Sequence, residues 1–348
     1  MANILHLPLS EAAEDSITQE IKVRTWWSLY MIDQWSSAGL DLNKQMHDDN
    51  HRLPIQETTF WSLKRGESMG QDDQPSLGLW GYMVILARIF GKIQDLHQQL
   101  SNGVLNEHHA EMITQELAQE FENFEQELPT DLHFTVHNLE QHSVVGLGQA
   151  FVALHLGYHH YATLLYFPFF DIQLSQTRSR ALFASRCKHH ATMFSDLLRT
   201  SHETPDCEAV YLIVAHMTVV SSAALLHTLL FGNHDEIFDA RNRLCSNFEI
   251  LLKLKPYWPG VDLMVGRKIC KADSKFRANI SQMERLFTFQ KVCMRSMDKT
   301  YTVDRWIVNF LLQHALPIDG ETEAPATSDL AERGKFANDA LSILRPEM

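Results

Sequence analysis

One segment near the amino terminus, Lys22–Asp33, constrains the fold of this chain more than any other. Its bulky apolar residues are Val23, Trp26, Trp27, Tyr30, Met31 and Ile32, and Trp35 follows closely. At helical spacing they cover most of the circumference, which predicts a helix buried on nearly every side. Ser16 and Glu20 indicate a helix start, and Gly39 is a natural stop. Because each aromatic side chain can bury roughly 150–250 Å², we expect neighbouring segments to pack around this helix.

The composition indicates a globular, helix-rich protein. Of its 348 residues 45% are hydrophobic and 21% charged, with few Gly and Pro, which argues against disorder. The net charge of −13 gives no general attraction to nucleic acid or anionic membranes. Five scattered cysteines without a Cys-x-x-Cys pair predict reduced thiols. Residues 1–8 lack the basic region and the apolar length of a signal peptide, so we expect an intracellular protein.

Helical periodicity recurs along most of the chain, and no convincing strand pattern appears. We therefore expect an all-α multi-helix bundle, with helices over 79–100, 106–128, 143–166, 209–231, 261–297 and 303–316. The first two of these are joined by the short segment 101–103, which favours antiparallel neighbours. Residues 317–348 are acidic and rich in Pro, Ala and Thr, which predicts a flexible tail with a short helix near 330–344.

The most apolar segment, Ala209–Phe231, has no charged residue and the length of a membrane span, for which roughly 20 residues suffice. Its histidine and hydroxyl side chains, including His216 and His227, suit lipid poorly. Both flanks are acidic, so no Lys/Arg asymmetry would orient an insertion. We therefore predict a buried core helix and no membrane contact.

No residues form a convincing catalytic or metal site. His155 and His159 share a helix face, but a zinc site needs a third ligand, and hydrogen-bonded core histidines are the favoured interpretation. Asp48-Asp49 and Asp72-Asp73 lack the further carboxylate that a magnesium–diphosphate site requires. The basic cluster 267–277 is interrupted by acid and predicts a solvated face. We assign no catalytic, cofactor or metal residue; an all-α enzyme with a pocket between apolar helices stays the alternative.

Residue order supplies a more specific signal than any chemical motif. Arg-Thr-Trp-Trp-Ser-Leu-Tyr-Met-Ile-Asp at Arg24–Asp33, followed by an acidic loop and Leu53-Pro54, resembles the middle regulatory region of fungal binuclear zinc-cluster transcription factors. Leu154–His159, followed by Leu164–Phe169, is similar to a second family motif, although Tyr166-Phe167 stands where His-Arg is usual. Tyr257-Trp258-Pro259 resembles a third.

The resemblance implies a function and a set of core residues. It implies a helical regulatory domain over 1–316 of a nuclear transcription regulator, not an enzyme. Protein partners or a small effector are expected, and a homodimer is compatible with the resemblance.

The family's six-cysteine cluster has no counterpart in this sequence. Zinc and direct DNA contact are therefore implied only for that separate module or a partner, and no cofactor is expected in this chain. We expect the later part of such a protein, or a relative that lost its front. The family-motif core comprises Arg24, Trp26, Trp27, Tyr30, Asp33, Pro54, His155, Tyr158, Pro168, Trp258 and Pro259.

Overall fold

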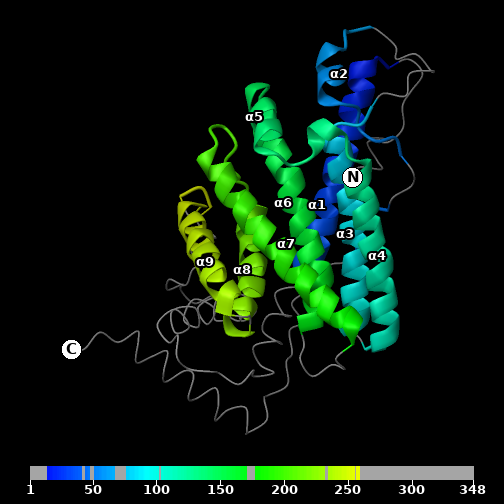
Figure 1. Ribbon diagram of the computed structural model, residues 1–348. Coiled ribbons are helices and arrows are strands. Elements are labelled where there is room, and N and C mark those ends of the chain that lie inside the picture. Colours follow the sequence, from blue (N-terminus) through cyan, green and yellow to red (C-terminus); the bar gives the residue numbers. More distant parts are fainter. Residues whose placement is uncertain are drawn as a thin grey trace, which may run out of the picture. The chain divides into compact units, whose positions relative to one another are not determined.

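The computed structural model describes residues 14–40, 44–47, 51–66, 76–101, 103–170, 177–231, 234–254 and 256–258. Within these ranges every regular element is a helix, and the one extended pairing is an isolated antiparallel bridge between Ile55 and Leu77 (Figure 1). The all-α prediction is confirmed. Several predicted features lie outside the described residues: Asp48-Asp49, Asp72-Asp73, Pro259, the basic cluster 267–277, the helices over 261–297 and 303–316, and the tail 317–348.

The described helices fall into two compact units, and the division lies inside one helix, between Tyr158 and His159. The first unit contains α1 (Ser16–Leu40), α2 (Glu57–Ser62), α3 (Leu79–Ser101), α4 (Glu107–Glu127), the 3-10 turn η1 (Thr130–Leu132), α5 (Val136–Val144) and the beginning of α6 (Gly148–Tyr166). The second contains the end of α6, η2 (Phe167–Phe170), α7 (Arg178–Glu203), α8 (Leu212–Phe231) and α9 (His234–Leu254).

The predicted antiparallel pair is present as α3 and α4. The Tyr82 ring meets Phe124 edge-on at 6.0 Å, while Lys92 Nζ lies 2.7 Å from Glu120 Oε1. Residue numbers therefore rise along one helix as they fall along the other, which confirms the antiparallel arrangement. Asn106 begins α4 as its N-cap, since its side-chain oxygen accepts from the His109 N–H at 2.9 Å.

The helix predicted over 143–166 is observed as α6, but its predicted start is wrong, because the chain turns between α5 and α6. Gly146 has φ +76°, a left-handed conformation that glycine adopts at little cost. The Leu147 N–H donates back to the His142 carbonyl at 2.7 Å, which closes α5. The apolar pair Val144-Val145 continues the hydrophobic pattern across this turn, yet Val144 is 84% exposed. The hydrophobic pattern of the sequence therefore gave no sign of the turn between α5 and α6.

The second unit is held together by packing among α7, α8 and α9. The predicted core helix at 209–231 is observed as α8, whose Val214, Ala215, Val220 and Ala223 have no solvent exposure. Among the described residues, no helix has the length and hydropathy to cross a membrane. α9 has no counterpart among the predicted helices.

Buried polar groups connect these three helices. Ser195 of α7 and Ser221 of α8 both donate to the Ala191 carbonyl, at 3.0 and 2.8 Å. Asn247 of α9 is fully buried and donates its side-chain N–H groups to Ser195 Oγ at 3.0 Å and Ser222 Oγ at 3.1 Å. Because buried polar groups are costly when unpaired, this network favours one alignment of the helices over others.

We expect Asn247→Ala to lower the free energy of unfolding by about 1–3 kcal/mol, because it removes two buried hydrogen bonds and leaves space in the core. The matched control is Asn123→Ala on α4, where the side chain of an exposed asparagine accepts from Gln119. Its effect should stay within about 0.5 kcal/mol. Urea unfolding of both variants measures the difference, and equal losses would contradict a structural role for Asn247.

Candidate functional site

Glu20 and family-motif residues of α1 anchor the loop that follows the helix. The Glu20 carboxylate, with no solvent exposure, accepts hydrogen bonds from Arg24 Nε at 3.0 Å, Arg52 Nη2 at 2.8 Å and the Ile55 N–H at 3.0 Å. Burial raises the pKa of this carboxyl, while the Arg52 guanidinium opposes that shift. One buried carboxylate thus joins a neighbouring turn of α1 to a loop more than thirty residues further on.

Three motif side chains complete this attachment through the loop backbone. Arg24 Nη2 donates to the Ile55 carbonyl at 2.6 Å, and Trp27 Nε1 donates to the Arg52 carbonyl at 2.8 Å. The Asp33 carboxylate accepts from the backbone N–H groups of residues 45 and 46, at 2.9 and 3.0 Å. We call Glu20, Arg24, Trp27 and Asp33 the loop-anchoring residues. Most of their partners are backbone atoms. These residues therefore constrain the path of the loop backbone and place little constraint on which side chains the loop carries.

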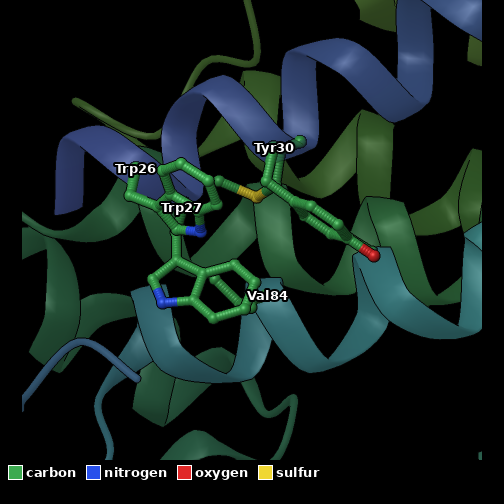
Figure 2. Close-up of a cluster of buried hydrophobic side chains, with 6 residues drawn as sticks. Trp26, Trp27, Tyr30 and Val84 are labelled. Atoms are coloured by element: carbon green, nitrogen blue, oxygen red, sulfur yellow. The ribbon is translucent and has the colours of Figure 1, made fainter. Parts of the chain in front are cut away.

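The two tryptophans lie in the core of the first unit. Trp26 is 3% exposed and Trp27 0%, and they cluster with Tyr30, Met31, Val84 and Ala87. Figure 2 shows the α1 side chains reaching toward the helix that carries Val84. Trp27 meets Tyr30 edge-on at 5.2 Å and lies 4.9 Å under the Arg88 guanidinium. Whereas the Trp27 N–H is hydrogen-bonded, the buried Trp26 N–H has no partner in the described structure.

The prediction that α1 is buried on nearly every side is wrong. Ile21 is 50% exposed, Leu29 37% and Ile32 52%. Only the face that carries the tryptophans and the loop-anchoring residues is covered. The sequence pattern overstated burial because it counted apolar residues without knowing how many neighbours the helix has.

A second anchoring contact, which the sequence analysis did not predict, lies at the start of α3. The buried Glu57 carboxylate of α2 accepts from the N–H groups of Leu79 at 3.0 Å and Trp80 at 3.1 Å, the first residues of that helix. A Cβ on Gly78 would lie 2.1 Å from Glu57 Oε2 and 2.8 Å from the Gln56 Cα, so glycine is required for this approach. Glu57 also lies 3.8 Å from Arg24 Nη1, which joins this cap to the loop-anchoring residues.

Three of the remaining family-motif residues donate hydrogen bonds to other segments of the chain. His155 Nε2 donates to the Leu132 carbonyl at 3.0 Å, and the Tyr158 hydroxyl donates to Glu125 at 3.0 Å. Trp258 Nε1 donates to the Val210 carbonyl at 2.5 Å. Pro54 is buried beside Ile55, and Pro168 lies within η2. Pro259 lies outside the described residues.

His155 and His159, which were expected to share a helix face, have different contacts in the structure. Whereas His155 bonds to a backbone carbonyl, His159 Nδ1 lies 3.0 Å from His190 Nδ1. Among the described residues, no three His, Cys, Asp or Glu side chains are grouped to hold a metal ion. Burial lowers the pKa of His155 to about 4 and that of His227 to about 3. The same cause holds the pKa of His160 well below its usual value. These imidazoles are therefore neutral parts of the core at pH 7.

An open groove of about 560 Å³ lies at the ends of α2, α3 and α5. It is lined by apolar residues such as Leu77 and Leu132 and by Glu57, Asp131 and His142, with no Lys or Arg. Its volume falls within the range of small-molecule pockets, and its lining suits a neutral or cationic molecule better than an anion.

Comparison with known proteins gives two relatives of low identity. The chain is 23% identical over 306 residues to an uncharacterised transcriptional regulatory protein of Schizosaccharomyces pombe, covering 74% of this chain and 36% of the relative. It is 21% identical over 267 residues to a Zn(2)-C6 fungal-type transcription factor of Fusarium oxysporum f. sp. lycopersici, covering 70% of this chain and 28% of that protein. The chain thus spans about a third of their length.

No family model and no solved structure matches the chain. The two similarities support kinship with fungal transcription regulators. They agree with the resemblance carried by the residues of α1, α6 and the Trp258 turn.

We expect Trp27→Phe to lower the melting temperature more than Trp26→Phe. The first change removes the hydrogen bond from the Trp27 indole to the half-buried Arg52 carbonyl, whereas the second removes an indole N–H that has no partner in the described structure. The difference should be about 1–3 kcal/mol in the free energy of unfolding. Both variants replace an indole by a phenyl ring, so each is the control for the loss of ring size in the other. An equal loss would contradict the role assigned to the Trp27 hydrogen bond.

Stability should also fall on acidification below the ordinary histidine pKa. The unfolded chain binds protons near pH 6.5, whereas buried His155 resists protonation down to about pH 4. Because the unfolded state then binds more protons, the free energy of unfolding decreases as pH falls through this window. At pH 5 the loss from His155 alone is about 2 kcal/mol. Urea unfolding between pH 7 and 5 measures it, and His155→Gln should give a shallower slope; an unchanged slope would contradict the assignment.

Proposed function

We propose that this chain is a regulatory domain of a nuclear transcription regulator of the fungal zinc-cluster type. The observation that carries the proposal is the similarity to two fungal regulators over about 70% or more of the chain. It is supported by the motif residues of α1: Trp26, Trp27 and Tyr30 are buried, and Arg24, Trp27 and Asp33 attach the following loop. The all-helical architecture is compatible with such a domain.

The proposed domain acts by binding a protein partner or a small effector. Its net charge of −13 opposes direct association with DNA phosphates, so we propose that a separate DNA-binding module or a partner brings it to promoters. The loop-anchoring residues contribute a fixed structure on which such binding surfaces are presented. We propose no catalytic role for them, because their polar atoms are paired with backbone groups of the loop and with one another.

A tethering assay tests the proposal. We expect the chain, fused to an unrelated DNA-binding module in yeast, to change transcription of a reporter carrying that module's site by several-fold. The same chain without the module should leave the reporter unchanged, because a chain of net charge −13 has no general attraction to promoter DNA. The module alone sets the baseline. A fused, well-expressed chain with baseline transcription would contradict a regulatory function, and an untethered chain with full effect would contradict the need for a separate module.

A further inference from the structure

The open groove at the ends of α2, α3 and α5, which we call the η1 groove, lies within the first unit. Its lining residues come from four places in the sequence: the start of α2, the start of α3, the η1 turn, and α5 with the turn that follows it. Its volume of about 560 Å³ is in the range of sites that bind small molecules.

Hydrogen bonds between the lining segments hold the η1 groove in shape. The Gln56 N–H donates to the Ser76 carbonyl at 3.0 Å, and the Ser76 hydroxyl donates back to Gln56 Oε1 at 3.1 Å, which joins the segments before α2 and α3. The side-chain amide of Asn138 in α5 donates to the carbonyls of Thr130 and His133, at 2.9 and 2.8 Å, which fixes the η1 turn. The groove is therefore preformed, and a ligand that binds there does not have to order these segments first.

The charges of the η1 groove disfavour an anion. The N-terminus of α3 borders the groove, and a free helix N-terminus attracts negative charge. The Leu79 and Trp80 N–H groups, however, already donate to the Glu57 carboxylate. The other acid in the lining is Asp131, and no Lys or Arg lines the groove. An anion would therefore meet two carboxylates and no cationic side chain.

Asp131 is the carboxylate that can bind a ligand. It is exposed, and it forms no ion pair with a lysine or arginine in the part of the chain that the structure describes. Glu57, in contrast, accepts two backbone N–H groups and lies 3.8 Å from Arg24 Nη1. Burial raises the pKa of the Tyr82 hydroxyl, and the charges of Glu127 and Asp131 add to that shift. The electrostatic potential beside Asp131 is therefore negative.

The rest of the lining fits an apolar body and further hydrogen-bond donors. Leu77, Leu132 and Leu147 bring aliphatic side chains from three separate segments. The exposed side chains of Thr58 and Gln141 carry acceptor oxygens, and neither side chain is hydrogen-bonded to another described residue. An ammonium group has three N–H donors. One carboxylate and such neutral oxygens can satisfy it, while the remainder of the molecule covers the leucines.

We infer that the η1 groove binds a small organic amine, with its ammonium group at Asp131 and its apolar body against the leucines. The inference rests on the proposed function where it makes this amine the effector of a regulatory domain. The binding itself depends only on the groove. Because Glu57 both lines the groove and lies beside Arg24, the ligand would occupy a site next to the loop-anchoring residues.

We expect phenethylamine, a cation at pH 7, to bind the full chain with a Kd in the millimolar range, as suits a probe with few atoms. Its neutral analogue 2-phenylethanol should bind roughly three- to fivefold more weakly, the effect of one ion pair at an exposed carboxylate. The anion 3-phenylpropanoate should bind more weakly still. NMR titrations of the chain with methyl-labelled leucines measure all three: the signals of Leu77 and Leu147 should shift, and that of Leu182 on α7 should not.

A pair of variants tests the role of Asp131. Asp131→Asn should bind the amine and the alcohol equally. The matched control is Glu116→Gln on α4, which removes the same charge at an exposed position outside the groove and should keep the preference for the amine. Three results would overturn the inference: no shift of the groove leucines at roughly 10 mM amine, equal binding of amine and alcohol to the wild-type chain, or a preference that survives Asp131→Asn.

The tethering assay described above separates this inference from the proposed function. A chain that binds none of the probes but changes reporter transcription overturns the amine site and leaves the proposed function standing. A chain that binds the amine through Asp131 but leaves the tethered reporter at baseline supports the amine site and contradicts the regulatory function.

Discussion

The buried carboxylate of Glu20 is the interaction on which the amino-terminal unit depends. Removing a charged group from water costs several kcal/mol, and the cost is recovered only when every oxygen is well paired. Here two guanidinium groups and a backbone N–H share the carboxylate. Each of these donors comes from a part of the chain that must be correctly placed before Glu20 can be buried. The network therefore ties the position of the loop to the formation of α1, and Trp27 and Asp33 fix the same loop at two more points.

Much of this architecture was predictable from local sequence. The period of apolar residues indicated α3, α4 and α8, and Asn106 marked the start of α4 because its side chain caps the helix. Residue order around Trp26 and Trp27 singled out α1 as a core helix. These signals act within a few residues of one another, so a single sequence contains them in full.

What escaped prediction depends on contacts between distant segments. Glu57 looks like an ordinary surface acid in the sequence, and only the approach of Gly78 makes it the cap of α3. The turn at Gly146 was hidden by the apolar valines beside it, one of which turns out to be largely exposed. The exposed side of α1 was missed because apolar residues on a helix look alike whether or not a neighbour covers them. The anchoring role of Arg24 and Asp33 was likewise missed, because it depends on the path of the following loop, and the motif residues alone do not reveal that path.

The cap that Glu57 provides for α3 has a consequence for how this unit tolerates breaks in its chain. Most helix caps are made by the residue immediately before the helix, so a cut there separates cap from helix. In this protein the capping carboxylate belongs to α2, and the segment between Ser62 and Ser76 separates it from α3 in the sequence. Two further contacts join residues on either side of that segment: the bridge between Ile55 and Leu77, and the packing of Trp27 with residues of α3. Two fragments separated there therefore keep complementary surfaces. The first unit is thus suited to reconstitution from two chains, and insertions between α2 and α3 leave its helix caps intact.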